Sequence, residues 1–156
     1  MPFAIFLIPN MGAFYEKAIN KLLDSLENDA RRILRECVEE RTYQHRTRNL
    51  YDSYGYGIYV NGVLKRTGYL SSSPMAKVPR HIYGKDVRGR EEIRSYLEGN
   101  KKKGGISLAI VAAMPYAKIL EEGGDRLKHS YRVISMSFQK LEQIAGKYNA
   151  TVSAIK

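Results

Sequence analysis

The chain has almost no cysteine and no long apolar run, and both absences limit the classes of protein to which it can belong. Cys37 is the only cysteine among 156 residues, so no disulfide can form within the chain. It falls within an apolar helical pattern, which predicts an inert, partly buried thiol. The apolar start, residues 1–12, is far shorter than the roughly 20 residues of a membrane-spanning helix. It also lacks the basic leader and cleavage site of a signal peptide.

We therefore expect a protein that is cytoplasmic when made and has no membrane partner. Residues 1–12 would form either a short strand or an apolar arm that docks on a neighbour.

The sequence also lacks the residue patterns of metal, nucleotide and nucleophilic sites. No cysteine or carboxylate lies at zinc-ligand spacing from a histidine. Gly55-Tyr56-Gly57 lacks the further glycine and the helix of a dinucleotide loop, and Gly104-Gly105 has no Walker pattern. These absences predict a protein without cofactor or catalytic activity. The scattered histidines are His45, His81 and His129.

One acidic cluster keeps an enzymatic alternative open. Glu121, Glu122 and Asp125 lie close together in sequence, and a metal-dependent nuclease would need such carboxylates beside a basic surface. Adjacent glutamates at a helix end usually face different directions and stay in water. A nuclease is therefore the less favoured alternative.

Positive charge is concentrated in the middle of the chain. Residues 41–103 carry a net charge of +9, against −2 for residues 1–40 and +3 for residues 104–156. This concentration predicts contact with a phosphate backbone or an acidic protein surface, with a solvated loop as the plainer alternative. The basic loop region covers residues 71–105. Its residues expected to make electrostatic contacts are Lys77, Arg80, Lys85, Arg88, Lys101, Lys102 and Lys103.

Hydrophobic periodicity predicts an α+β fold in one domain covering residues 1–156. A small, mostly antiparallel sheet would pack against a long N-terminal helix and a C-terminal helix. The expected helices cover residues 13–40, 89–99, 116–122 and 130–149. The expected strands cover residues 55–60, 63–70 and 106–113, the last of them central, and residues 150–156 would be a loose tail.

A tight hairpin is predicted at Asn61-Gly62, because both positions of such a turn require positive φ. Four tyrosines crowd around its first strand. They could stack on nucleic-acid bases, although packing on a half-buried sheet is the commoner use. They are Tyr51, Tyr54, Tyr56 and Tyr59.

Two short segments about sixty residues apart, 46–53 and 115–123, are the most informative part of the chain. In order and spacing they resemble the tail-completion proteins of long-tailed phages and prophages. In that family a long helix precedes a Thr-Gly-x-Leu-x-x-Ser stretch, and a later strand runs into Tyr-Ala-x-x-x-Glu-x-Gly. The first stretch is matched by Thr47, Leu50 and Ser53, with Arg48-Asn49 where the family has Gly. The second is matched by Tyr116, Ala117, Glu121 and Gly123.

The resemblance implies a structural virion protein at the head–tail junction, or neck. Copies would form a homo-oligomeric ring, usually a hexamer in the family, between the head connector or adaptor and the tail terminator or tube. Genome DNA would pass through the ring. The matched residues would then determine fold and interface, and the long helix and the apolar arm are candidate ring contacts. The alternative from the residues alone is a small basic nucleic-acid-binding protein.

Overall fold

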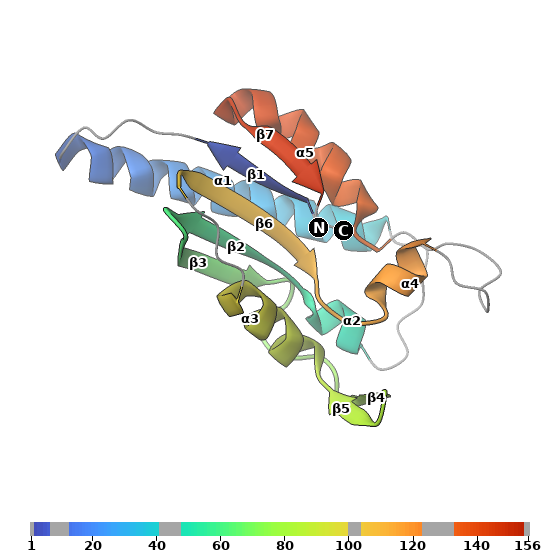
Figure 1. Ribbon diagram of the computed structural model, residues 1–156. Coiled ribbons are helices and arrows are strands. Elements are labelled where there is room, and N and C mark those ends of the chain that lie inside the picture. The colour runs from blue at the N-terminus through green and yellow to red at the C-terminus, as the bar shows by residue number, and fades with distance from the viewer. Residues whose placement is uncertain (1, 7–12, 41–47, 100–103, 123–132, 155–156) are drawn as a thin grey trace.

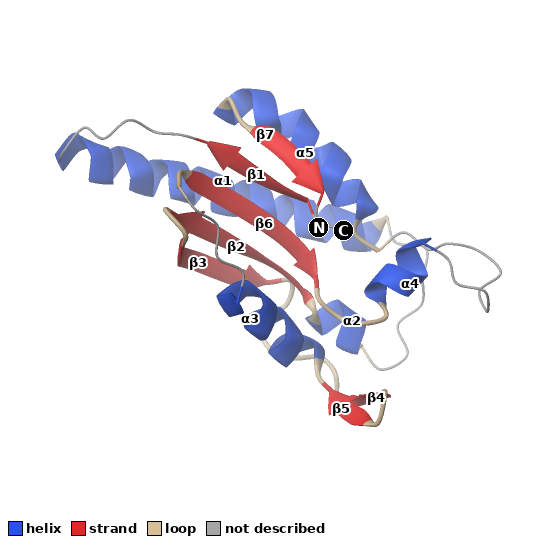
Figure 2. Cartoon of the chain, viewed as in Figure 1, coloured by secondary structure: helices blue, strands red, loops and turns tan. Residues whose placement is uncertain are grey.

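The computed structural model of the protein describes residues 2–6, 13–40, 48–99, 104–122 and 133–154. Five antiparallel strands form one sheet in the order β3-β2-β6-β1-β7, and a separate two-stranded hairpin projects below it (Figures 1 and 2). Helices lie on both faces of the sheet. The predicted α+β fold, with an N-terminal and a C-terminal helix on an antiparallel sheet, is confirmed.

Six of the seven predicted helix and strand ranges agree with the structure to within one residue at each end, whereas the C-terminal helix begins five residues later than predicted. The helices are α1 (Ala13–Glu39), α2 (Asn49–Asp52), α3 (Gly89–Gly99), α4 (Ala117–Glu122) and α5 (Ser135–Tyr148). The strands are β1 (Pro2–Phe6), β2 (Tyr54–Val60), β3 (Val63–Tyr69), β4 (Arg80–Ile82), β5 (Lys85–Val87), β6 (Ile106–Ala112) and β7 (Thr151–Ala154). No described helix has the length and apolar character needed to cross a membrane.

Helix α1 packs its apolar stripe on one face of the sheet. Its sequence is uninterrupted by glycine or proline, and apolar residues recur every three or four positions, so one side of a long helix can be buried continuously. In its first half the buried positions are Ile19 and Leu23. The later buried positions are Leu26, Ala30, Ile33, Leu34, Cys37 and Val38.

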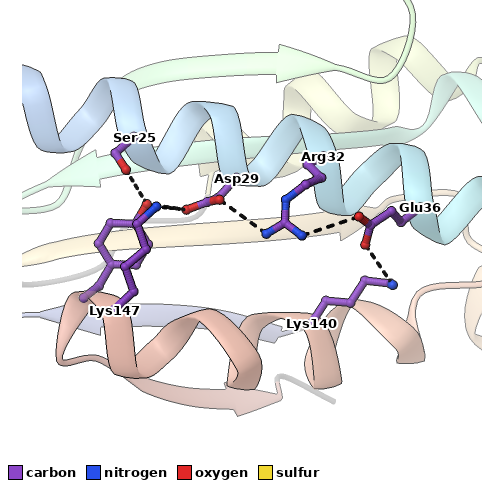
Figure 3. A network of polar contacts seen from close by, with 7 residues as sticks. Ser25, Asp29, Arg32, Glu36, Lys140 and Lys147 are labelled. Atoms are coloured by element: carbon purple, nitrogen blue, oxygen red, sulfur yellow. Dashed lines mark hydrogen bonds and ion pairs between the residues drawn. The ribbon is translucent and has the colours of Figure 1, made fainter.

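Helix α5 covers the same face beside α1, and a chain of polar contacts joins the two helices (Figure 3). Asp29 accepts hydrogen bonds from the Tyr148 hydroxyl and, at 3.1 Å, from Lys147 Nζ. Two turns further along, Lys140 Nζ lies 2.9 Å from Glu36. Burial acts to raise the pKa of Asp29, but the hydrogen bonds from Tyr148 and Lys147 outweigh it and leave that pKa lowered.

The tyrosines of β2 are core residues whose hydroxyls are all used. Tyr54 donates to the Val133 carbonyl at 2.6 Å, and Tyr56 donates to Glu27 at 2.6 Å. Tyr59, on the opposite face, donates to the Leu97 carbonyl at 2.6 Å. All three rings are buried. The alternative that they stack on nucleic-acid bases is therefore wrong, and the prediction that they pack in the sheet is confirmed.

The second face of the sheet is covered by α3, which approaches β2 closely. A Cβ atom on Gly55 would lie 2.9 Å from Ile93, and one on Gly57 would lie 2.8 Å from Leu97. The two glycines therefore leave the space in which the buried side chains of α3 sit. A smaller core forms there around Ile93 and Leu97.

At the start of the chain the short-strand alternative is confirmed, and at its end the expectation is corrected. Residues 2–6 form β1 and not a docking arm; β1 is an inner strand paired to β6 on one side and to β7 on the other. Residues 151–154, expected to be part of a loose tail, form β7 at the edge of the sheet. Both strands are short and pair with partners that are distant in sequence, so local patterns do not predict their place in the sheet. Residues 7–12 lie outside the described ranges.

Candidate functional site

The first motif segment forms a turn and the one-turn helix α2 at the start of β2. Arg48 has a left-handed backbone with φ 61°, and α2 begins at the next residue. Leu50 joins the main core and is 4% exposed. Ser53 is fully buried, and its Oγ donates to the Leu50 carbonyl at 2.7 Å. Thr47 lies outside the described residues.

The second motif segment forms α4 and caps the next helix. Ala117 is buried, and Tyr116 is partly buried against the main core. One carboxylate oxygen of Glu121 accepts hydrogen bonds from the backbone N–H groups of Val133 at 2.8 Å and Ile134 at 2.7 Å. It also accepts a longer bond, 3.3 Å, from the N–H of Ser135, the first residue of α5. Glu121 thus satisfies donors that the start of α5 leaves unpaired. Gly123 is outside the described ranges.

The fold brings the two motif segments together. The N–H of Ala113, at the end of β6, donates to the Ser53 carbonyl at 3.1 Å. Burial raises the pKa of the Tyr116 phenol, while nearby Arg80 and a hydrogen bond with the Leu50 backbone oppose the rise. Residues that are distant in sequence therefore form one structural unit where β2 begins and β6 ends. The matched residues that the structure describes pack or hydrogen-bond within this unit.

A basic segment, defined here as residues 71–89, is fastened to this unit by two buried polar side chains. Both oxygens of Asp52 accept from the Met75 N–H, at 2.8 and 2.9 Å, and one also accepts from the Ala76 N–H at 2.7 Å. Asn49 donates to the Val78 carbonyl at 2.7 Å and accepts from the Gly89 N–H at 3.1 Å. Asn49 and Asp52 thereby fix both ends of a segment that has little core of its own.

Part of the basic segment, predicted to be a loop, forms the projecting β4–β5 hairpin (Figure 1). Tyr83 and Gly84 turn the chain with φ values of 48° and 77°, as a tight hairpin requires. Ile82 and Val87 pack partly against the main core, so apolar contacts attach the hairpin to the rest of the protein. Sequence reasoning missed it because its strands span only three residues each.

The predicted electrostatic residues lie on the exposed surface of this segment where the structure describes them. Arg80 stacks over the Tyr116 ring at 5.8 Å, which links the basic segment to the second motif. Beside them, Tyr83 is 87% exposed, the largest fraction among the exposed apolar and aromatic side chains of the described residues. The exposed cationic residues are Lys77, Arg80, Lys85 and Arg88. Lys101, Lys102 and Lys103 lie outside the described ranges.

Sequence reasoning missed Asn49, Asp52, Tyr83, Arg90 and Arg94. Asn49 and Asp52 are 0% and 2% exposed, and buried polar residues need partners that a sequence does not reveal. The Tyr83-Gly84 pair carries a weak turn signal that could have indicated the hairpin. Arg90 directly follows the basic segment on α3, and the position of that helix brings Arg94 to the same place.

The described residues offer little support for a metal or a nucleophile. No group of three His, Cys, Asp or Glu within them is placed to hold a metal ion. Glu122 is exposed beside Lys118, and Asp125 lies outside the described residues. Burial raises the pKa of the Cys37 thiol to about 12, which keeps it protonated and inert, as predicted.

Comparison of the chain with protein-family models, with curated proteins and with solved structures yields no match. The functional interpretation therefore depends on the residues and geometry described above.

Proposed function

We propose that this protein is a structural component of the head–tail junction of a long-tailed phage or prophage. Its copies would form a ring between the head connector and the tail, around the genome DNA, with no catalytic role. The observation that carries the proposal is the backbone of Arg48. Where the family pattern has Gly, this residue has φ 61°, a conformation that Gly adopts without strain and other residues rarely adopt.

This turn supports the proposal because the departure from the pattern lies in the side chain and not in the backbone. The chain keeps a glycine-like turn at Arg48 and enters α2 directly, with Leu50 and Ser53 buried behind it. An Arg forced into this conformation is otherwise unexpected, since nothing in its own chemistry favours positive φ.

The second motif segment adds independent support. Its acidic position, Glu121, is used as the cap of α5, and its Tyr-Ala pair packs beside the first segment. The residues of the second motif segment thus have structural roles, which agrees with a family pattern whose residues determine the fold.

The exposed charge suits a ring that surrounds DNA. Nonspecific attraction to phosphates needs cations on a surface and no contact with base edges. Lys77, Lys85 and Arg88 are exposed on the basic segment, and Arg80 lies with them above Tyr116. The outward side of α1 and the β4–β5 hairpin are the candidate contacts with neighbouring copies. Residues 2–6 have both backbone edges paired within the sheet, so they offer no free edge to which a strand of a neighbouring copy could be added.

Electron microscopy of particles made after disruption of the gene in its phage or prophage tests this function. We expect DNA-filled or leaking heads separate from free tails, with joining restored by the wild-type gene. A rescue gene with Lys101, Lys102 and Lys103 changed to Ser should restore joining less well or retain less DNA, while the chain still folds. Normal, infectious, tailed particles from the disrupted gene would refute the head–tail assignment.

A second candidate function, a nucleic-acid-binding protein acting outside the virion, is favoured by one observation. The projecting hairpin combines exposed cations with the exposed ring of Tyr83, which leaves both charge and a stacking surface free in water. Tight DNA binding by the isolated monomer near physiological salt, falling steeply as salt rises, would favour this candidate. Weak binding that requires assembled rings would favour the head–tail role.

A further inference from the structure

An arginine-lined cavity lies where α2, the basic segment and the first turns of α3 meet. Its volume is about 230 Å³, and it is open to solvent on one side. Arg88, Arg90 and Arg94 line it, together with the carboxylates of Asp52 and Glu91. None of the candidate residues predicted from the sequence, Arg88 excepted, lies in this cavity. It is therefore a distinct feature of the folded protein.

The other polar groups in the wall of the cavity are already engaged with the protein. The Asp52 carboxylate accepts three hydrogen bonds from the N–H groups of Met75 and Ala76, which stabilise its negative charge. The Asn49 side chain bonds Val78 and Gly89. These two side chains form part of the cavity wall, and the arginines are the groups that can bind a ligand.

The three arginines are not paired directly with carboxylates. A hydrogen bond with Tyr69 and, at longer range, the carboxylates of Glu98 and Glu91 raise the pKa of Arg94. Within the described part of the chain, no carboxylate lies within 4.0 Å of any of their three guanidinium groups. Arg90 stacks over the Tyr69 ring at 3.9 Å and donates from Nη2 to the Ser71 carbonyl at 2.7 Å. Its Nε is buried and has no hydrogen-bond partner, which is uncommon for a buried donor. The three arginines outnumber the two carboxylates in the wall of the cavity, Asp52 and Glu91, so an anion that enters it meets a net positive charge.

We propose that this cavity binds a phosphate group, or a similar tetrahedral oxyanion, through Arg88, Arg90 and Arg94. Guanidinium groups match the oxygens of a phosphate with paired, charge-assisted hydrogen bonds. The N-terminal end of α3, an 11-residue helix whose first turn borders the cavity, adds a favourable dipole. The source of the phosphate is either a free anion or the backbone of a nucleic acid. The inference does not depend on the head–tail assignment, because it concerns the isolated chain.

Thermal unfolding of the full chain in sodium phosphate, against sodium chloride at equal ionic strength, tests the binding. Saturating phosphate should raise the melting temperature by about 2 °C or more, since a ligand that binds only the folded state stabilises it. Arg94→Gln should remove the rise, and the matched variant Arg35→Gln, which changes an exposed arginine of α1 outside the cavity, should keep it. Absence of any rise in the wild type, or an equal rise in Arg94→Gln, would overturn the proposal.

A second variant shows whether loss of the rise in Arg94→Gln comes from lost binding or from a change in the fold, because Arg94 lies within α3. Arg88→Gln changes an exposed side chain of the cavity and should also reduce the rise, with an unchanged circular dichroism spectrum. Folded Arg88→Gln protein that keeps the full rise would count against the site as firmly as an unresponsive wild type.

Fluorescence anisotropy with a short labelled oligonucleotide distinguishes the two sources. If the cavity takes backbone phosphate, free phosphate competes with the oligonucleotide beyond its effect on ionic strength, and Arg94→Gln weakens oligonucleotide binding about tenfold or more, as loss of one strong charged contact does. If the cavity takes the free anion, Arg94→Gln loses the phosphate response and binds the oligonucleotide like Arg35→Gln. Either result supports an oxyanion site and assigns its source.

Discussion

Asp52 and Glu121 perform the same physical task in two different regions of the molecule. Each lies in a short helix next to a central strand, and each collects three hydrogen bonds from backbone N–H groups of a later segment. Asp52 is 2% exposed and holds the basic segment, whereas Glu121 is only partly buried and caps α5.

The difference between the two regions is what surrounds the anchor. Helix α5 also packs on the sheet and on α1, so Glu121 assists an element that has a large core of its own. The basic segment has only the partial packing of Ile82 and Val87 behind it, and it depends on Asp52 and Asn49 for its position. A carboxylate thus supports the fold in one place and positions the candidate binding surface in the other.

The largest expected effect is that of Asp52→Asn. An amide cannot accept all three hydrogen bonds, and its NH₂ group would face backbone donors in a buried site, so we expect a loss of about 3 kcal/mol in the free energy of unfolding. Urea denaturation measures this loss, and hydrogen exchange should show faster exchange at Met75 and Ala76. The matched control is Asp86→Asn, an exposed carboxylate of the hairpin bonded only to His81, which should cost less than about 0.5 kcal/mol. Equal losses in the two variants would remove the special role of Asp52.

Gly55→Ala tests whether the stability of the protein depends on the close approach of α3 to β2. The added Cβ would lie 2.7 Å from the Gly68 carbonyl oxygen and 2.9 Å from Ile93, and the backbone atom cannot move aside easily. We expect a loss of about 2 kcal/mol, measured by chemical denaturation. Gly99→Ala, at the end of α3 with nothing within 4 Å of the new Cβ, should be neutral or slightly stabilising. A neutral Gly55→Ala would mean that α3 is not held close by the glycines.

Glu121→Gln should have a smaller effect than Asp52→Asn, because the partly exposed cap supports a helix that is packed independently. We expect a loss of about 1 kcal/mol, the usual range for a helix cap. Glu122→Gln is the matched control and should be near zero, since that exposed side chain only faces Lys118 at 3.8 Å. A cost for Glu121→Gln as large as that for Asp52→Asn would break the distinction between the two regions.

The smallest expected effect is a gain. Arg48→Gly places a residue that tolerates φ 61° at the entry to α2, and we expect about 1 kcal/mol of added stability after the extra flexibility of the unfolded chain is included. Asn149→Gly, at φ 52° after α5, is the comparison, and it should change stability little because Asn adopts this conformation readily. Destabilisation by Arg48→Gly would indicate that the arginine side chain itself holds the turn.

Much of the fold could be predicted because it follows from local patterns. The apolar spacing of α1, the Asn61-Gly62 turn and the apolar run of β6 each carry their signal within a few residues. The candidate site could be predicted only in part. Lys77, Arg80, Lys85 and Arg88 were indicated by charge alone, whereas Asn49, Asp52 and the arginines of α3 gain their roles from contacts with distant segments.

The sequence by itself determined the α+β class, the long helix and the concentration of positive charge, because periodicity and composition are properties of neighbouring residues. Only the tertiary structure decided that β1 is an inner strand, that Glu121 caps α5 and that three arginines share one cavity. Each of these depends on pairing or burial between residues far apart in the chain, and the free energy of such contacts appears only when the sheet and its helices are assembled.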